Sequence, residues 1–406
     1  MSRIILGVAG GIAAYKACEL LRRFTEAGHD VTVIPTEAAL NFVGRTTWQA
    51  LSGNPVHTDV WTDSHEVRHV KLGQTADLVV VAPATADLLA RAATGRADDL
   101  LTNTLLTAHC PVVMAPAMHT EMWLHAATQA NVATLRERGV VVMDPASGRL
   151  TGADTGPGRL PDAVDIHAVA LSLLDQPETA AAAADQDLAG KHVVVSAGGT
   201  RERLDPVRYL GNASSGLMGL SIARAAALRG ADVTLVAAHI EHPVPSGCTV
   251  RRVESTADLA ETMTELSESA DVIVMAVAAA DFTPRTRAES KIKKASESSG
   301  LQLDLVQTTD VLKTISHARP RPQVIVGFAA ETATDADHLL ELGRAKLARK
   351  GCDLLVLNDV SGGKVFGEDD NRIVVISPDD VLGHHSGPKS VVAHRILDAV
   401  HSVAAR

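Results

Sequence analysis

The sequence predicts two doubly wound α/β domains, and three observations support this fold class. The chain has 406 residues, a length that favours two domains over one. In each half, short apolar runs typical of strands alternate with segments of helical periodicity. Between the halves, near residues 171–189, an Ala-, Asp- and Gln-rich stretch interrupts this alternation. We therefore expect a first domain over 1–175, a linker over 176–190 and a second domain over 191–406.

The first half opens with an apolar strand, Ile4–Val8, and a helical segment, Ile12–Ala27, that stops at Gly28. Apolar runs without alternation are typical of parallel strands that are buried on both faces. By this pattern the further strands of the first sheet are Val31–Pro35, Asp77–Pro83 and Pro111–Ala115.

The second half repeats the same pattern, with a helix expected to begin around Ser214. Near its end, a glycine-rich turn at Gly362–Gly363 separates two strand-like runs, which indicates a hairpin and a mixed edge on the second sheet. The predicted strands of this half are His192–Ser196, Asp232–Ala237, Asp271–Val277, Val324–Phe328, Asp353–Leu357 and Arg372–Ile376.

The composition limits the classes of partner. A formal net charge of −10 argues against nucleic acid, whereas the lysines at 291, 293 and 294 suit an anionic small molecule. No apolar run reaches the roughly 18 residues of a membrane helix, so we expect no membrane partner. The isolated cysteines and the absence of signal-peptide features predict a reducing compartment, by default the cytoplasm.

The turn after the first strand of the second half is suited to a charged ligand. Gly198 and Gly199 let the backbone approach it, and the helix expected near Ser214 offers free N–H groups to an anion. The turn differs from the compact G-x-G-x-x-G of dinucleotide-binding domains, and an ordinary α/β loop is the alternative. The intervening loop supplies the polar residues Arg201, Arg203, Asp205, Arg208 and Asn212.

Strand ends in the first half also carry ligand-binding groups. The turn Gly7–Lys16 leads directly into a helix, so its first N–H groups can bind a phosphate. Thr36 follows one strand, and Pro83 ends another, ahead of Thr85 and Asp87. Carboxyl ends of parallel strands are the usual binding edge of such sheets, so these side chains are candidates for holding a ligand.

Four ordered motifs of the first half, GGIAAYK, APATADLLA, APAMHTEMW and TGADTGPGRL, resemble those of the flavin-containing cysteine decarboxylases. The resemblance is strongest to the phosphopantothenoylcysteine decarboxylase half of bifunctional proteins of coenzyme A biosynthesis. It implies a flavodoxin-like domain that binds FMN. The implied FMN contacts are Gly11, Ile12, Ala13, Thr36, Pro83, Ala84, Thr85, Asp87 and Met118.

The resemblance also implies a catalytic base. Family members use a histidine ahead of the APAT strand, and His69 in the segment HVKLG matches it. The implied chemistry is oxidation of the cysteinyl thiol by the flavin, loss of CO₂, and return of the electrons to the product. An imidazole at the surface or at a helix end is the alternative role for His69.

Two residues depart from the family pattern. The family usually has Asn after the Met of P-x-M-N-x-x-M-W, to bind the substrate carboxylate, and here His119 stands there. An imidazole can donate a hydrogen bond to a carboxylate, and binding by another residue is the alternative. Many members also have a flap cysteine that helps return the reduced intermediate to product, and Gly152 occupies that position here. The proton donor of that return step is left open.

The second half resembles the phosphopantothenate–cysteine ligases. Such enzymes use CTP to convert the carboxylate of 4′-phosphopantothenate into an acyl-cytidylate, and the amine of L-cysteine then displaces CMP. The consumption of a triphosphate implies Mg²⁺, for which no protein ligand is assigned. The matching segments are SAGGT, DPVRYLGNASSGLMG, AVAAADF, KIKK, GFAAET, Lys346 with Lys350, and LNDV.

The ligase resemblance assigns roles to individual residues. Asn212 is expected to contact the acyl-cytidylate, because its amide can donate to an acyl or phosphate oxygen. Lysines neutralise the charge of the triphosphate, although a solvated lysine face and a core position for Phe328 are the alternatives. The expected nucleotide-binding residues are Asp281, Lys291, Thr309, Asp310, Phe328, Lys346 and Lys350.

We therefore expect a bifunctional enzyme that ligates and then decarboxylates, to give 4′-phosphopantetheine. A regulatory FMN-binding protein that acts through partner contacts is the alternative, and a two-domain NAD(P) reductase is disfavoured because G-x-G-x-x-G is missing. The resemblance implies a homo-oligomer. Trimeric decarboxylase contacts and dimeric ligase contacts on one chain predict a dodecamer.

Overall fold

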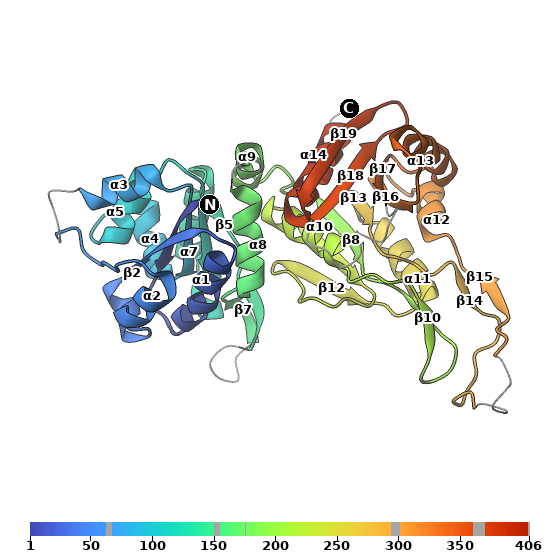
Figure 1. Ribbon diagram of the computed structural model, residues 1–406, viewed down its shortest axis with the longest axis horizontal. Coiled ribbons are helices and arrows are strands. Elements are labelled where there is room, and N and C mark those ends of the chain that lie inside the picture. Colours follow the sequence, from blue (N-terminus) through green and yellow to red (C-terminus); the bar gives the residue numbers. More distant parts are fainter. Residues whose placement is uncertain (62–66, 150–154, 175, 294–300, 360–369, 405–406) are drawn as a thin grey trace. The chain divides into compact units, whose positions relative to one another are not determined.

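The computed structural model describes the chain except residues 62–66, 150–154, 175, 294–300, 360–369 and 405–406. It divides into two compact units, each described by itself (Figure 1). Unit 1 comprises Met1–Asp187, Leu228–Gly230 and Pro245–Gly247. Unit 2 comprises Leu188–Ala227, Ala231–Val244 and Cys248–Arg406.

Unit 1 is built on a five-stranded parallel sheet of order β2-β1-β3-β4-β5. This is the strand order of flavodoxin-like domains, with a switch point between β1 and β3, and it confirms the predicted fold class. A small antiparallel ribbon, β6–β7, follows β5. The strands are β1 (Arg3–Val8), β2 (Asp30–Pro35), β3 (Leu78–Ala84), β4 (Val112–Pro116), β5 (Val141–Val142), β6 (Ala146–Arg149) and β7 (Thr155–Arg159).

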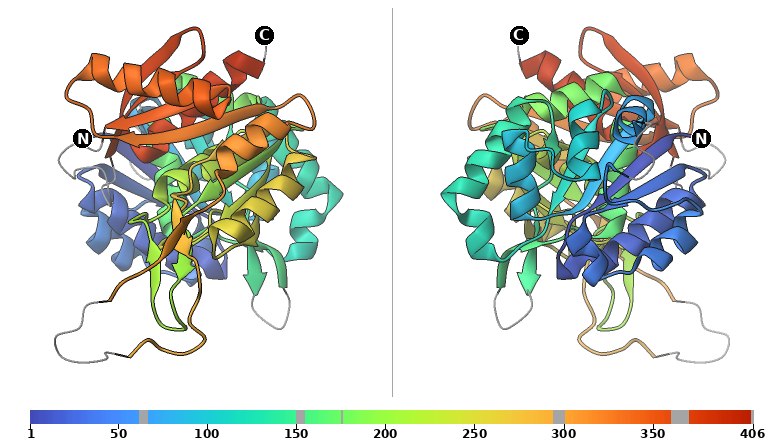
Figure 2. Two further views of the ribbon diagram at one scale, coloured as in Figure 1. Left: turned by 90° about the vertical axis from the view of Figure 1, so that its right-hand side faces the viewer. Right: turned by 90° about the vertical axis from the view of Figure 1, so that its left-hand side faces the viewer.

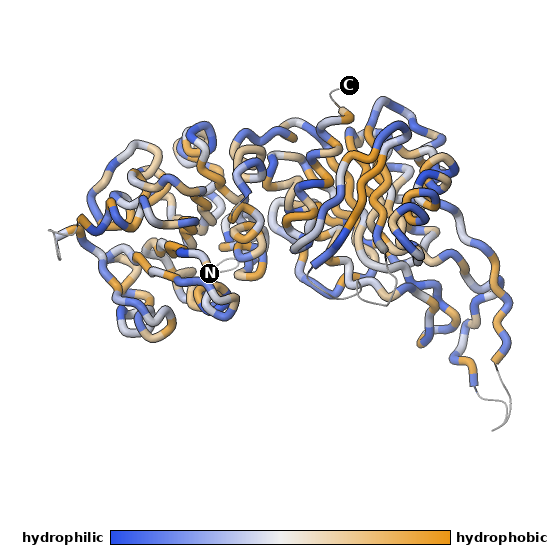
Figure 3. The backbone as a smooth tube through the Cα atoms, turned by 45° about the horizontal axis from the view of Figure 1, so that its top comes forward, coloured by the Kyte–Doolittle hydropathy of each residue, from blue (hydrophilic) through white to orange (hydrophobic). Residues whose placement is uncertain are grey.

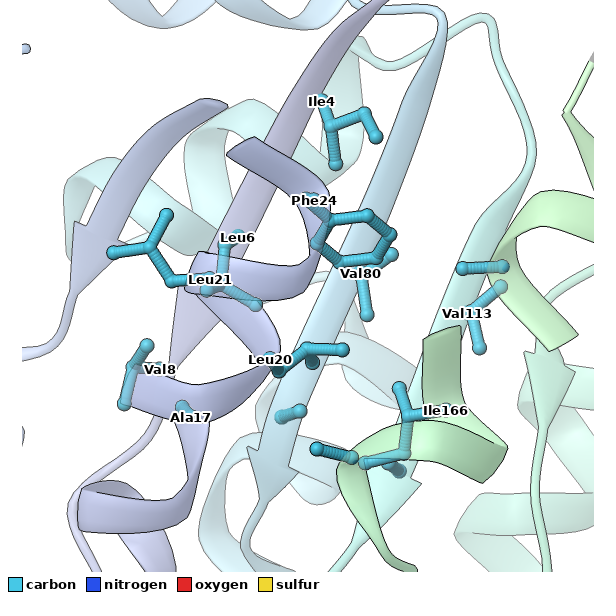
Figure 4. Packing of buried hydrophobic residues seen from close by; sticks show 14 of the residues in the cluster. Ile4, Leu6, Val8, Ala17, Leu20, Leu21, Phe24, Val80, Val113 and Ile166 are labelled. Atoms are coloured by element: carbon cyan, nitrogen blue, oxygen red, sulfur yellow. The ribbon is translucent and has the colours of Figure 1, made fainter. Parts of the chain in front are cut away.

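Helices cover both faces of the first sheet. On one face, Leu20, Leu21 and Phe24 of α1 pack with the strands and with Ile166 of α8 (Figure 4). The other face is covered by α4, α5 and α7. The helices are η1 (Ile12–Lys16), α1 (Ala17–Glu26), η2 (Glu37–Asn41), α2 (Arg45–Ser52), α3 (Arg68–Thr75), α4 (Ala86–Thr94), α5 (Leu100–Thr107), α6 (Thr120–Leu124), α7 (Ala126–Glu137), α8 (Ala163–Leu173) and α9 (Pro177–Asp185).

Two segments of unit 1 differ from the sequence-based expectation. The single helix expected over Ile12–Ala27 is divided into the 3₁₀ turn η1 and the α-helix α1. Most of the expected linker, 176–190, is the helix α9, whose Thr179 and Ala183 are buried. Alanine is the best helix former and Pro177 stands at the first turn, so this composition favours a helix over a flexible linker.

Unit 2 is built on an eight-stranded sheet of order β12-β11-β8-β13-β16-β17-β18-β19. The strands from β12 to β17 run parallel, in the order of a Rossmann-type domain with its switch point between β8 and β13. Antiparallel β18 and β19 add the predicted mixed edge. Figure 3 shows hydrophobic residues along the central strands of this sheet. The turn expected at Gly362–Gly363 lies outside the described residues.

Two ribbons are added to the second unit: β9 pairs with β10, and β14 pairs with β15. Strand β14 lies against β9, and Figure 2 shows the two ribbons extending together from the body of the unit. The strands are β8 (His192–Ala197), β9 (Arg201–Arg203), β10 (Tyr209–Gly211), β11 (Asp232–Ala237), β12 (Cys248–Arg252), β13 (Val272–Met275), β14 (Phe282–Pro284), β15 (Leu305–Gln307), β16 (Val324–Glu331), β17 (Leu354–Asp359), β18 (Asp370–Ile376) and β19 (Val381–Pro388).

The helices α10 and α14 pack on one face of the second sheet, and α11, α12 and α13 pack on the other. The expected helix start at Ser214 is wrong, because α10 begins at Leu217. Gly216 has a φ of +81°, a left-handed conformation that interrupts a helix. The helices are α10 (Leu217–Leu228), α11 (Thr256–Ser267), α12 (Val311–Ala318), α13 (Ala336–Lys350) and α14 (Lys389–Ala404).

A search of the described helices finds none with the length and apolar character needed to cross a membrane.

Candidate active sites

Three strand ends of unit 1 meet at the carboxyl edge of the sheet, beside the switch point between β1 and β3. The Ala9 amide donates to the Pro83 carbonyl (3.1 Å), and the Thr36 amide donates to the Val8 carbonyl (2.9 Å). A Cβ on Gly11 would lie 3.5 Å from Thr85 Cγ2. The structure thus brings Gly11, Thr36 and Thr85 together, and we call these three residues the strand-end cluster of unit 1.

The strand-end cluster offers hydrogen-bond donors. The Thr36 hydroxyl accepts from the Ala39 amide and the Thr85 hydroxyl from the Leu88 amide, each at 3.3 Å. Each hydroxyl keeps its own proton for a ligand. Gly11 has an extended backbone and starts η1 without a side-chain cap, so the cluster also adjoins the first amides of η1, those of Ile12 and Ala13.

Three further residues expected at this site offer no unpaired side-chain group to a ligand. The side chains of Pro83 and Ala84 are buried, so they reach a ligand through the backbone at most. The Ala84 carbonyl already accepts from the Ala117 amide at 3.1 Å. Asp87 is exposed and pairs with Arg91 at 3.0 Å on the surface of α4. Its carboxylate therefore already has a cationic partner.

The segment before α6 is covered by the ribbon β6–β7. The Met118 amide donates to the Gly158 carbonyl at 2.9 Å, and a Cβ on Gly156 would lie 2.6 Å from Thr120 Oγ1. His119 precedes α6 and is exposed. Gly152, the position of the family's flap cysteine, lies outside the described residues. The docking of this glycine-rich ribbon leaves the His119 imidazole accessible.

His69 lies on α3, which packs against α5. Its carbonyl accepts from Thr107 Oγ1 of α5 at 2.8 Å, and Gly73 has no room for a Cβ against Thr107. This hydrogen bond joins α3 to α5. A single threonine at a helix end gives no sequence signal, so sequence reasoning missed Thr107.

A cavity of about 230 Å³ lies between β2 and α3, and none of the predicted site residues lines it. Its polar lining includes Asn54, His57, Arg68 and Lys71.

In unit 2, the turns after β8 and β13 are joined at the switch point. The Ala278 amide donates to the Gly198 carbonyl (2.8 Å), and the Ala280 amide donates to Thr200 Oγ1 (2.8 Å). The Asn212 side-chain amide donates to the Ala279 carbonyl at 3.0 Å. Asn212 itself is exposed, so the structure places it at the mouth of this double turn.

The segment before α12 continues the same edge. The Thr308 amide donates to the Asp281 carbonyl at 3.0 Å, and Asp310 caps α12 by accepting from the Lys313 amide at 3.1 Å. Asp281 and Thr309 are exposed. The ammonium of Lys350 reaches Asp310 at 2.5 Å. Asp281, Thr309, Asp310 and Lys350 therefore form one continuous set.

Both predicted lysines of α13 already have carboxylate partners. Lys346 pairs with Glu331 at 2.8 Å and Lys350 pairs with Asp310, on the same face of the helix. Burial raises the pKa of the Asp310 carboxyl, but the Lys350 hydrogen bond, the Lys313 amide and their charges bring it below its usual value. Phe328 is half-buried and packs against the core. Each ammonium group therefore already has a carboxylate partner.

Lys291 is exposed on the segment after β14, and Lys293 is also exposed. Lys294 lies outside the described residues. The backbone of this segment is held by the turn between β9 and β10, where the Arg208 guanidinium donates to the Ile292 carbonyl at 3.0 Å. The backbone next to Lys291 is therefore anchored by a tertiary hydrogen bond.

Comparison with known proteins identifies the family. A family model described as "Flavoprotein" matches residues 1–174, and one described as "DNA/pantothenate metabolism flavoprotein C-terminal domain" matches residues 188–403. The coenzyme A biosynthesis bifunctional protein CoaBC of Mycolicibacterium smegmatis is 56% identical over 408 residues, covering 98% of this chain and 97% of the relative. The chain belongs to the CoaBC family.

Other CoaBC proteins extend this match. The CoaBC of Mycobacterium tuberculosis is 55% identical over 98% of this chain and 96% of its own length. The CoaBC of Vibrio cholerae is 39% identical over 98% of both chains. The family has a flavoprotein half and a second half, and both are present here. Membership in this family supports the bifunctional enzyme over the regulatory flavoprotein.

Proposed function

We propose that the chain carries out two successive steps of coenzyme A biosynthesis. Unit 2 joins 4′-phosphopantothenate to L-cysteine with CTP, and unit 1 decarboxylates the product to 4′-phosphopantetheine with FMN. The observation that carries this proposal is one chain that matches the CoaBC proteins over nearly its whole length, with a polar strand-end site at the switch point of each sheet. Its cysteines are not joined by disulfide bonds, in keeping with a cytoplasmic enzyme.

The strand-end cluster of unit 1 fits a flavin nucleotide. The amides of Ile12 and Ala13 would hold the phosphate, and the hydroxyls of Thr36 and Thr85 would donate to the polar groups of FMN. When bound, FMN supplies the reversible two-electron chemistry that makes loss of CO₂ from the cysteinyl group easy. Met118 and His119, on the neighbouring strand end, would lie beside the substrate carboxylate.

His69 would hold or move a proton during decarboxylation. Because α3 packs against α5 and no described hydrogen bond joins His69 to Gly11, Thr36 or Thr85, we propose that assembly brings it to the flavin of another copy. The surface next to the cluster is apolar: Ile12 is 65% exposed and Tyr15 is 59% exposed. Exposed apolar side chains beside a site are typical of an interface between subunits, here of a trimer.

The ligase step needs positive charge and hydrogen-bond donors at one place. A carboxylate oxygen of 4′-phosphopantothenate attacks the α-phosphorus of CTP and pyrophosphate leaves. The cysteine amine then attacks the acyl carbon, loses a proton and displaces CMP. Lys291 would stabilise phosphate charge, and Asn212 would donate to the acyl-cytidylate. Mg²⁺ would be held largely by the triphosphate and water.

The ribbons of unit 2 are suited to a dimer contact. Val207 is 61% exposed, and Tyr209 and Phe282 are also exposed although they are large and apolar. Twofold contacts through these ribbons and threefold contacts through unit 1 would close into a dodecamer. Light scattering tests this: a mass near that of one chain would contradict it.

Single-turnover mass spectrometry tests the proposed function. Purified protein is given 4′-phosphopantothenate, L-cysteine, CTP and Mg²⁺, and the wild type is expected to form 4′-phosphopantetheine. Release of neither pyrophosphate nor CO₂ would contradict both halves of the proposal. A wild type that stops at phosphopantothenoylcysteine would show that the His119 and Gly152 departures have disabled the flavin half.

A further inference from the structure

A fully buried carboxylate lies in the turn between β9 and β10. Asp205 has no solvent exposure, and its Oδ1 accepts from the amides of Val207 (2.7 Å) and Arg208 (2.8 Å). Its Oδ2 accepts from the Arg208 guanidinium (3.0 Å) and from the amide of Ile292 (3.1 Å). One carboxylate thus ties a local turn to a segment 87 residues further along the chain.

The tie to Ile292 is reinforced on both sides. The Ile292 carbonyl accepts from the Arg208 guanidinium at 3.0 Å, and the Ala288 amide donates to the Leu204 carbonyl at 3.0 Å. The N–H of Ile292 belongs to the planar peptide that it shares with Lys291. Holding this N–H therefore fixes the peptide plane from which the exposed Lys291 side chain leaves.

The same hairpin leads into Asn212. Strand β10 ends at Gly211, and the next residue, Asn212, donates its side-chain amide to the Ala279 carbonyl at 3.0 Å. The Asp205 turn is therefore linked to both groups that the ligase step requires: the Lys291 ammonium through Ile292, and the Asn212 amide through β10.

We propose that Asp205 is a positioning residue of the ligase site, which sets where Lys291 stands relative to Asn212 and the nucleotide triphosphate. This inference rests on the proposed function, in which Lys291 binds CTP. Burial raises the pKa of the Asp205 carboxyl, but the amides of Val207, Ile292 and Arg208 and the charge of Arg208 more than offset this. The Asp205 carboxyl is therefore ionised at neutral pH. Only the ionised form offers both oxygens as acceptors to all four donors.

Asp205→Asn tests the proposal by removing one acceptor. An asparagine has one oxygen and one NH₂ group, so either the turn amides or the Ile292 amide must face a second donor. We expect the KM for CTP in pyrophosphate release to rise about tenfold, the loss typical of one charged hydrogen bond, with a smaller change in kcat. Decarboxylation of supplied phosphopantothenoylcysteine should be unchanged.

Asp304→Asn is the matched control. Asp304 is an exposed carboxylate that pairs with Arg285 at 2.7 Å, on the segment that bears β15. Exposed ion pairs contribute little, so its KM for CTP should stay within about twofold of the wild type.

A double-mutant cycle separates positioning from general structure. If Asp205 acts through Lys291, adding Asp205→Asn to Lys291→Ala should raise the KM for CTP no further. Ile292→Pro supplies a second route, because proline lacks the N–H that Asp205 accepts, and Ile292→Ala keeps it. Ile292→Pro should match Asp205→Asn, and Ile292→Ala should change KM less.

The outcomes distinguish the two claims. If wild-type protein with CTP, 4′-phosphopantothenate and Mg²⁺ releases no pyrophosphate, the proposed function falls and this inference with it. If the wild type is active and Ile292→Pro or Asp205→Asn leaves the KM for CTP unchanged, the positioning role alone is overturned. Additive effects of Asp205→Asn and Lys291→Ala would overturn it as well.

Discussion

The two candidate sites occupy the same place in their sheets but are built differently. In unit 1 the cluster consists of a glycine and two threonines whose hydroxyls already cap short helices. In unit 2 the corresponding edge carries charged side chains, and those of α13 are already paired with carboxylates. A resident cofactor suits a site made of backbone and small groups. A site that binds and releases a triphosphate suits lysines that pair with carboxylates of the same chain when the triphosphate is absent.

This difference gives each site its own weakness. In our proposal the first site depends on close backbone approach and on His69 from another copy of the chain. The second depends on the balance between lysines and carboxylates. Substitutions that disturb one kind of dependence should leave the other site's reaction intact.

The largest expected effect is that of His69→Asn on decarboxylation. Loss of a general acid or base typically slows a reaction by about 10² to 10⁴-fold. We expect CO₂ release from phosphopantothenoylcysteine to fall within that range, while CTP-dependent pyrophosphate release stays at the wild-type rate. Equal losses of both activities would show that the two sites are not separable.

Lys350→Ala should have the next largest effect, on the ligase alone. It leaves the Asp310 carboxylate without its ammonium partner at the nucleotide edge. We expect the KM for CTP to rise about tenfold. CTP loses a charged hydrogen bond from Lys350, and the unpaired carboxylate of Asp310 repels its phosphates. Lys350→Ala combined with Asp310→Asn should recover part of this loss. If the double variant is no better than Lys350→Ala, repulsion by Asp310 is not the cause.

Gly10→Ala and Gly11→Ala form a matched pair for the first site. A Cβ on Gly10 would collide with Ala38, whereas one on Gly11 would only reach ordinary contact with Thr85 at 3.5 Å. Overpacking costs about 1–3 kcal/mol, so Gly10→Ala should lower the thermal midpoint and the flavin content after purification. Gly11→Ala should lower the midpoint less. The reverse order would contradict the packing described for this turn.

The smallest expected effect is a pH dependence. The pKa of Asp310 is lowered in the folded chain, so its contribution to stability is present above the unfolded value of about 3.9 and is lost as the pH falls through the folded value. Urea unfolding should therefore show wild type more stable than Asp310→Asn at neutral pH. The difference should shrink below about pH 4, and a constant difference would contradict this assignment.

The positions of the strands were the part of the fold that could be predicted from the sequence. Buried parallel strands such as β3 and β8 are continuous apolar runs, so their position and type follow from hydropathy. Helix ends were less predictable: the left-handed Gly216 moves the start of α10, and no periodicity reports a φ value. The linker was expected over 176–190 because the strand–helix alternation stops there, whereas its alanines form most of α9.

For the sites, sequence supplied the residues but not their partners. The family motif points to Lys350. Its ion-pair partner, Asp310, lies 40 residues away in the sequence, on another element, so the motif does not reveal the pair. The tie between Asp205 and Ile292 spans 87 residues, and no local pattern reports it. The motifs also leave open whether His69 lies near Gly11, Thr36 and Thr85, because they give the order along the chain and not the distance in space.

The most direct test of two separate sites in one chain is a mixing experiment with His69→Asn and Asn212→Asp. Each variant alone, given 4′-phosphopantothenate, L-cysteine, CTP and Mg²⁺, should form little 4′-phosphopantetheine by mass spectrometry. His69→Asn should accumulate phosphopantothenoylcysteine, and an equal mixture of the two should form the final product. A mixture as inactive as either variant, or loss of both half-reactions in one variant, would contradict the account.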